Sequence, residues 1–160
     1  MGSSFKKITY FQNEIGCDIQ YLTMINTMPN LTKVSTKTGY GPHLMLDLEQ
    51  CDSIALNCLE TCFQFLYEAP EILGMTKITA PYVFRYNAPI PEEQGITGVV
   101  IIAESHISIH TYPFKQYAFV DMFSCKPFDV DKAKSFCTSF FKSQSYSESL
   151  VQRGQTFPRT

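Results

Sequence analysis

Glu104, Ser105 and His106 stand together within an otherwise apolar stretch, GVVIIAESHISIHTYP, and a second histidine, His110, follows four residues later. Serine offers a hydroxyl nucleophile, and histidine titrates near neutral pH, so that it can act as a general base. Polar groups of this kind are uncommon inside a strand pattern. The stretch is therefore the first candidate for chemistry in this chain.

The alternation of side chains along a strand groups these polar residues on one face. On the segment 106–111 the residues of this face are His106, Ser108 and His110. On the following segment, YAFVDMFSC, the same count groups Tyr117, Phe119, Asp121, Phe123 and Cys125. If the two segments pair, imidazoles, a carboxylate and a thiol can share one face of a sheet.

Three interpretations of this cluster remain open at the level of residue types. Ser105, His110 and Asp121 could form a hydrolase triad, but the chain has no G-x-S-x-G turn to present the serine. His106 and His110 could bind a metal, but no convincing third ligand stands near them. The polar face could also be an ordinary hydrogen-bonded sheet surface.

The elements that position the cluster follow from the hydrophobic patterns. Strands are predicted at 43–49, 76–86, 97–103, 106–111 and 117–125. A first helix begins at Asp52 or Ser53 and ends no later than Pro70, with an apolar stripe made of Leu56, Leu59, Phe63 and Leu66. A second helix is capped by Asp129 and carries Ala133, Phe136, Cys137, Phe140 and Phe141 on one face.

This order predicts an α+β fold: a two-layer sandwich with an antiparallel sheet and two helices on one face. We expect an N-terminal extension at 1–42, one domain at 43–145 and a polar C-terminal tail at 146–160. The aromatic residues on the other face of the sheet require a cover. A second subunit packed sheet against sheet would provide it, and the N-terminal extension is the alternative.

Composition excludes several classes of function. The 160 residues carry a formal charge of −2 without a basic run, so neither nucleic acid nor an anionic membrane is an expected partner. The chain has no apolar run long enough to span a membrane and no secretory signal at its start, which predicts a cytoplasmic protein. Its six cysteines form no CxxC pair, so free thiols and no metal site are expected.

The segments GITGVVIIAESHISIHTYP and YAFVDMFSC resemble the processing-site region of bacterial and archaeal S-adenosylmethionine decarboxylases, pyruvoyl-dependent enzymes of polyamine biosynthesis. A weaker resemblance includes HLMLDLEQCD and DVDKA, so that it covers roughly residues 43–141. The resemblance implies a homodimeric proenzyme that cuts its own backbone between Glu104 and Ser105. Ser105 then becomes a pyruvoyl group that forms a Schiff base with a small amino-acid-type substrate, without metal or pyridoxal phosphate.

The same resemblance assigns roles to other residues. His110 is the base for processing, Thr97 stands where the family has an assisting serine, and Cys125 is the proton donor in turnover. Asp47 stands where many members carry an acidic residue near the site.

The sequence departs from the family pattern at the positions that bind the substrate. Phe114 replaces the glutamate that binds ribose in the family, and the aromatic residue that stacks on adenine corresponds to Pro91 or, with a shift, to Tyr86. S-adenosylmethionine is the expected substrate, and the alternative is L-ornithine or L-arginine, whose distal cation Glu92, Glu93 or Asp121 could bind. A non-processing regulatory subunit is the second alternative.

Overall fold

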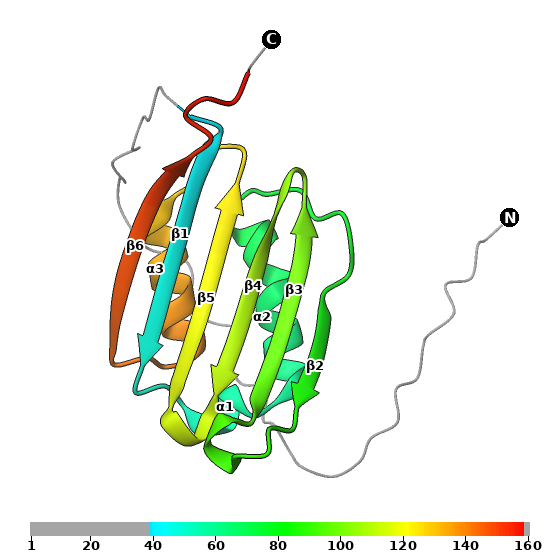
Figure 1. Cartoon of the computed structure of the whole chain (residues 1–160), viewed down its shortest axis with the longest axis vertical. Helices are drawn as coiled ribbons and strands as arrows, with labels where there is room; N and C mark the ends of the chain where they lie inside the picture. The colour runs from blue at the N-terminus through cyan, green and yellow to red at the C-terminus, as the bar shows by residue number, and fades with distance from the viewer. Residues whose placement is uncertain (1–38, 159–160) are drawn as a thin grey trace, which may run out of the picture.

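The computed structural model describes residues 39–158, and residues 1–38 of the predicted N-terminal extension lie outside this range. Within it, one six-stranded antiparallel sheet has the strand order β2-β3-β4-β5-β1-β6, and the helices cover one of its faces (Figure 1). The elements are β1 Gly41–Glu49, α1 Ser53–Leu56, α2 Leu59–Ile72, β2 Tyr82–Tyr86, the 3₁₀ turn η1 Pro91–Glu93, β3 Gly95–Ile102, β4 Ser105–Tyr112, the 3₁₀ turn η2 Pro113–Lys115, β5 Tyr117–Ser124, α3 Val130–Phe140 and β6 Ser145–Arg153. The predicted α+β two-layer architecture is confirmed.

The alternation in the central strands sorts side chains between the two faces as expected. Ile107, Ile109 and Thr111 of β4 are buried beneath the helices, whereas His106, Ser108 and His110 lie on the opposite, open face. The registers of β4 and β5 place His106 opposite Phe123, Ser108 opposite Asp121 and His110 opposite Phe119. The predicted shared face is therefore present.

The first predicted helix is divided in two, and this changes its buried face. Asn57 ends α1, and α2 begins at Leu59, which rotates the apolar stripe relative to a single continuous helix. Leu59 and Phe63 are 42% and 38% exposed, so their predicted place in the core is wrong. The buried residues of α2 are instead Cys62, Phe65, Leu66, Ala69 and Pro70.

The helix also continues past Pro70, contrary to the prediction that it ends there. Pro70 stands in the last turn of α2, where its missing N–H removes a single helical hydrogen bond. The next turn still closes, because the N–H of Leu73 donates to the carbonyl of Ala69 at 3.1 Å. Two further residues, Glu71 and Ile72, therefore remain helical.

Two strand boundaries differ from the sequence prediction. Only Tyr82–Tyr86 of the segment 76–86 forms a strand, while Lys77 makes an isolated bridge to Ile102. Residues 146–153, predicted to be a tail, belong to β6, which pairs with β1 along its whole length. β6 is an edge strand whose residues are almost all exposed, so its sequence lacks the apolar alternation by which strands are recognised.

The second predicted helix has the expected cap and face. The Asp129 carboxylate accepts a hydrogen bond from the N–H of Lys132 at 2.9 Å and begins α3. Ala133, Cys137 and Phe141 are fully buried. The Phe65 ring of α2 packs parallel to that of Phe136 at 5.3 Å, so the two helices share one aromatic core over the sheet.

Candidate active site

Ser105 is the first residue of β4, directly after the tight turn Ala103–Glu104 that joins it to β3. Its neighbours in the sheet are Ile102 on β3 and Ser124 on β5. The Ser105 Oγ atom is buried, and no described residue forms a hydrogen bond with it. A buried hydroxyl without a hydrogen-bond partner lowers the stability of the fold. A reaction that consumes the Ser105 hydroxyl would therefore remove no stabilising hydrogen bond.

Cys125 lies beside the turn that precedes Ser105, one residue beyond the end of β5. The Glu104 N–H points at the Cys125 Sγ atom with an N···S distance of 3.4 Å. Burial raises the pKa of Cys51 to about 11 and that of Cys62 to about 12, and it also raises the pKa of Cys137. Cys125 is partly exposed and is thus the accessible one of these four free thiols.

His110 and Thr97 form a second group farther along the sheet. They are paired across β3 and β4, and the Thr97 Oγ1 and His110 Nδ1 atoms are 3.0 Å apart, within hydrogen-bond distance. His110 lies five residues from Ser105 on one strand, which corresponds to about 16 Å at the usual rise of a strand. The structure therefore brings His110 to Thr97 but not to Ser105 of the same chain.

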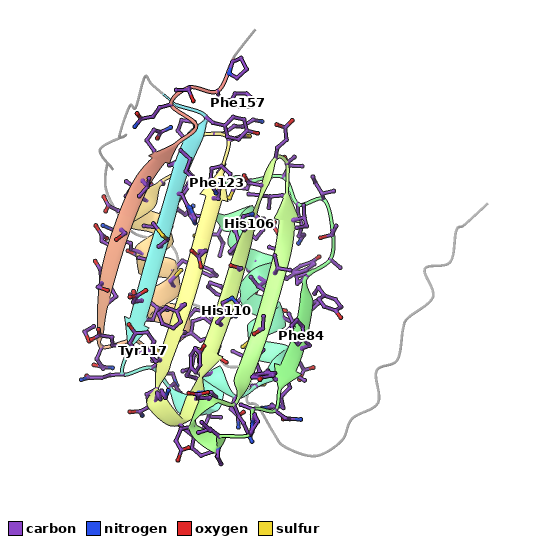
Figure 2. The ribbon with its side chains drawn as sticks, in the orientation of Figure 1. Phe84, His106, His110, Tyr117, Phe123 and Phe157 are labelled. Carbon is purple, nitrogen blue, oxygen red and sulfur yellow. The ribbon has the colours of Figure 1, made fainter. Side chains whose placement is uncertain are left out.

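His43 belongs to the open face near Ser105, and the sequence analysis missed it. It is paired with Phe123, which in turn is paired with His106, so the three rings form one row across β1, β5 and β4 (Figure 2 labels Phe123 and His106). The His43 Nε2 atom is 3.3 Å from Asp121 Oδ1. The alternation of HLMLDLE could have revealed this residue, since it places His43, Met45 and Asp47 on one face.

The row changes the ionisation of His106. Partial burial is the largest effect and lowers the pKa of His106, and the nearby His43 lowers it further. The Asp121 carboxylate opposes this shift. His106 is therefore biased toward the neutral imidazole beside the Glu104–Ser105 bond.

An aromatic hollow of about 500 Å³ lies at the opposite end of β4 and β5. Its walls are Tyr86, Glu93, Tyr112, Lys115, Tyr117 and Phe119. Of the substrate residues predicted from sequence, Tyr86 and Glu93 are in this wall, whereas Phe114 is 68% exposed and outside it. Asp47 is paired with Phe119 and lies next to the hollow, but Asp121 lies farther along β5 beside His43.

Two of the alternatives from residue types lack the geometry they need. A Ser105–His110–Asp121 triad is not assembled, because His110 contacts Thr97 and Asp121 contacts His43. Within residues 39–158, no group of three His, Cys, Asp or Glu side chains could hold a metal ion. None of the helices in this range is long and apolar enough to cross a membrane.

The comparisons with known proteins agree with this arrangement. The family model of S-adenosylmethionine decarboxylase matches residues 42–154. The chain belongs to the S-adenosylmethionine decarboxylase family. The match includes β3, β4 and the turn between them, Cys125 and the whole of β6. This edge strand is therefore part of the family's domain.

Relatives and a solved structure support this membership. The chain is 32% identical over 126 residues to the S-adenosylmethionine decarboxylase proenzyme of Pyrococcus abyssi, covering 75% of this chain and 86% of the relative. It is 35% identical over 115 residues to the proenzyme of Thermococcus onnurineus, covering 71% and 77%. The crystal structure of the adenosylmethionine decarboxylase from Aquifex aeolicus superposes with a TM-score of 0.64 at 29% identity, covering 73% of this chain and 92% of that one.

Proposed function

We propose that this chain is a self-processing, pyruvoyl-dependent decarboxylase of polyamine biosynthesis whose substrate is S-adenosylmethionine. The observation that carries the proposal is the buried Ser105 hydroxyl, which has no hydrogen-bond partner among residues 39–158 and lies beside the Glu104–Ser105 peptide bond. The Cys125 thiol lies on the amide of Glu104. Family membership supports the same chemistry, because the relatives are named proenzymes of this decarboxylase.

Processing would consume the Ser105 side chain. Its Oγ atom attacks the carbonyl carbon of Glu104, the bond to the Ser105 nitrogen breaks, and the nitrogen keeps the proton that the hydroxyl loses. A base then removes the α-proton of residue 105, and the carboxylate of Glu104 leaves from the β-carbon. Hydration of the resulting dehydroalanine releases ammonia and leaves a ketone at the new N-terminus. The chain becomes two fragments, 1–104 and 105–160.

The residues around position 105 fit a pyruvoyl group. The ketone of the pyruvoyl group supplies an electron sink for the electrons released as carbon dioxide departs. Cys125 lies beside the residue that would carry it and is accessible, so its thiol is in place to return a proton to the substrate carbon. Neutral His106 adds no positive charge next to the ketone.

The aromatic hollow supports a nucleoside substrate over a simple amino acid. Four aromatic rings, those of Tyr86, Tyr112, Tyr117 and Phe119, provide flat surfaces on which a purine can stack. Glu93 adds a carboxylate that can accept hydrogen bonds from ribose hydroxyls, a role that Phe114 cannot fill. Ornithine and arginine have no ring to stack and need only an acidic group.

The separation of Ser105 from His110 supports a homodimer. His110 cannot reach Ser105 of its own chain, about 16 Å away along an extended strand. The open face of the sheet also exposes Phe84, Tyr86, Ile101 and Phe119. Two sheets packed face to face about a two-fold axis lying across the strands would cover these side chains. That packing places the His110 end of one chain over the Ser105 end of the other.

Intact-mass measurement of the purified protein tests the proposal. We expect two fragments, the larger ending at Glu104 and the smaller beginning with a pyruvoyl group in place of Ser105. Ser105→Ala should remain a single chain, whereas Ser108→Ala, a serine on the open face of the same strand, should be cut as in the wild type. An uncut wild-type chain would instead favour the non-processing regulatory subunit.

The release of labelled carbon dioxide from carboxyl-labelled substrates tests which substrate is used. S-adenosylmethionine, ornithine and arginine are compared with the same processed protein. Release from S-adenosylmethionine alone is the expected result. Release from ornithine or arginine alone would leave the pyruvoyl chemistry in place but would contradict the substrate, and no release from any of them would contradict the enzymatic function.

A further inference from the structure

Tyr40 contacts the residue that precedes the proposed cut, although the two are 64 positions apart in sequence. Its hydroxyl donates a hydrogen bond to the Glu104 Oε2 atom at 3.1 Å. The backbone N–H of the same glutamate points at Cys125 Sγ at 3.4 Å. Glu104 is therefore held at both its side chain and its amide, and these two contacts flank the carbonyl that Ser105 would attack.

The chain after β6 holds Tyr40 in place. The Tyr40 N–H donates to the Arg153 carbonyl at 2.6 Å, and its ring meets that of Phe157 edge-on at 4.6 Å. Gly154 has a φ of +65°, and a Cβ atom there would lie only 2.4 Å from the Tyr40 Cβ, so the close approach requires glycine. Figure 2 shows Phe157 at the same end of the sheet as Phe123 and His106.

We infer that Tyr40 is a positioning residue for self-cleavage, acting by tying the Glu104 side chain away from the scissile carbonyl. This inference rests on the proposed function. Attack by Ser105 builds negative charge on the Glu104 carbonyl oxygen, and the carboxylate of the same residue would repel that charge if it folded back. The hydrogen bond from Tyr40 holds the carboxylate at a fixed point and also restricts the conformations of the turn.

Tyr40 and Glu104 both belong to the larger fragment after the cut. The effect of the contact is therefore confined to the processing step, and the carbon dioxide release of fully cut protein should depend little on it. Removal of the hydroxyl in Tyr40→Phe should slow cutting by roughly tenfold, which corresponds to about 1.4 kcal/mol in the barrier.

The test follows cutting after a short pulse of cell-free translation of the full chain, with fragments separated by gel electrophoresis. Tyr40→Phe should be cut roughly tenfold more slowly than the wild type. The matched control is Tyr146→Phe, which removes a hydroxyl from the helix-covered side of β6 and should be cut at the wild-type rate. Equal rates for wild type and Tyr40→Phe would overturn the inference.

Variants at Glu104 separate positioning from a general effect on the fold. Glu104→Gln keeps an oxygen that can accept from Tyr40 and should be cut almost as fast as the wild type, whereas Glu104→Ala removes the acceptor. Adding Tyr40→Phe to Glu104→Ala should then have little further effect, because the contact is already lost. The same slowing by Tyr40→Phe in both backgrounds would contradict a role through Glu104.

The outcomes also distinguish this inference from the proposed function. A wild-type chain that is not cut at all contradicts both. A wild-type chain that is cut, together with a Tyr40→Phe chain that is cut equally fast, contradicts only the role of Tyr40. A thermal unfolding midpoint of the Ser105→Ala, Tyr40→Phe double variant below that of Ser105→Ala would assign Tyr40 to fold stability instead.

Discussion

At the scale of single residues, burial decides which cysteine can do chemistry. Cys51, Cys62 and Cys137 are in the core, and desolvation raises the pKa of each thiol because the charged thiolate is disfavoured there. The thiolate is the reactive form. Cys125 differs from these three in its exposure and in its contact with the Glu104 amide.

This contrast predicts the order of alkylation. At pH 8, Cys51, with a pKa of about 11, is almost entirely in the thiol form, so iodoacetamide should label Cys125 well before Cys51, Cys62 or Cys137. Labelling of processed protein should abolish carbon dioxide release at the rate at which Cys125 is modified, as followed by peptide mass analysis. Inactivation that precedes the modification of Cys125 would remove this thiol from turnover.

Glu93 is the second residue whose role can be decided by one substitution. Glu93→Gln removes the charge of a carboxylate in the hollow wall and should raise the KM for S-adenosylmethionine by roughly tenfold, the loss of one charge-assisted hydrogen bond. Its neighbour Glu92, which is not part of the wall, provides the control Glu92→Gln. Equal kinetics of the two variants would place the ribose elsewhere.

At the scale of elements, we expect the N-cap of α3 to contribute more to the free energy of unfolding than a surface ion pair of the same helix. Asp129 caps α3 through the Lys132 N–H, while Asp131 in the first turn forms an ion pair with Lys134 at 2.9 Å. We expect Asp129→Ala to lower the free energy of unfolding by about 1 kcal/mol. Asp131→Ala should cost less than about 0.5 kcal/mol, since Lys134 keeps its second partner Glu148.

Urea unfolding followed by circular dichroism measures both variants, in the Ser105→Ala background so that a single uncut chain unfolds. An effect of Asp131→Ala as large as that of Asp129→Ala would mean that the network of Asp131, Lys134 and Glu148 anchors α3 to β6.

The same scale shows which elements a sequence can reveal. β3, β4 and β5 could be predicted because one side of each strand is more buried than the other, so that their sequences show a recognisable strand pattern. β6 could not, because both of its sides are largely exposed and its pairing with β1 is a matter of backbone hydrogen bonds. The division between α1 and α2 was missed because no glycine or proline marks it.

At the scale of the whole molecule, the candidate site was only partly predictable. Glu104, Ser105 and Cys125 come together because a tight turn and an antiparallel pairing place them there, and both features can be read from local sequence. The contact from Tyr40 depends on a strand pairing that spans the whole domain, so no local pattern signals it. The separation of Ser105 from His110 follows simply from strand geometry, which makes spacing in sequence a poor guide to a shared site.

This separation leads to a prediction about two chains together. If His110 of one chain serves Ser105 of the other, two inactive variants should complement each other. Ser105→Ala keeps the base but lacks the hydroxyl that attacks the Glu104 carbonyl, and His110→Ala keeps the hydroxyl but lacks the base. Each alone should remain uncut, whereas co-expression with different affinity tags should yield mixed dimers in which only the His110→Ala chain is cut.

Mass analysis of the doubly purified mixture identifies which chain is cut. Cutting of the His110→Ala chain in the mixture, and not alone, follows only if the base is supplied in trans, because no residue of its own chain has changed. The control pairs His110→Ala with the double variant Ser105→Ala, His110→Ala, which dimerises without supplying a base and should leave both chains intact. Cutting of His110→Ala in isolation would show that His110 is not the required base, and His106, next to Ser105, would become the residue to test.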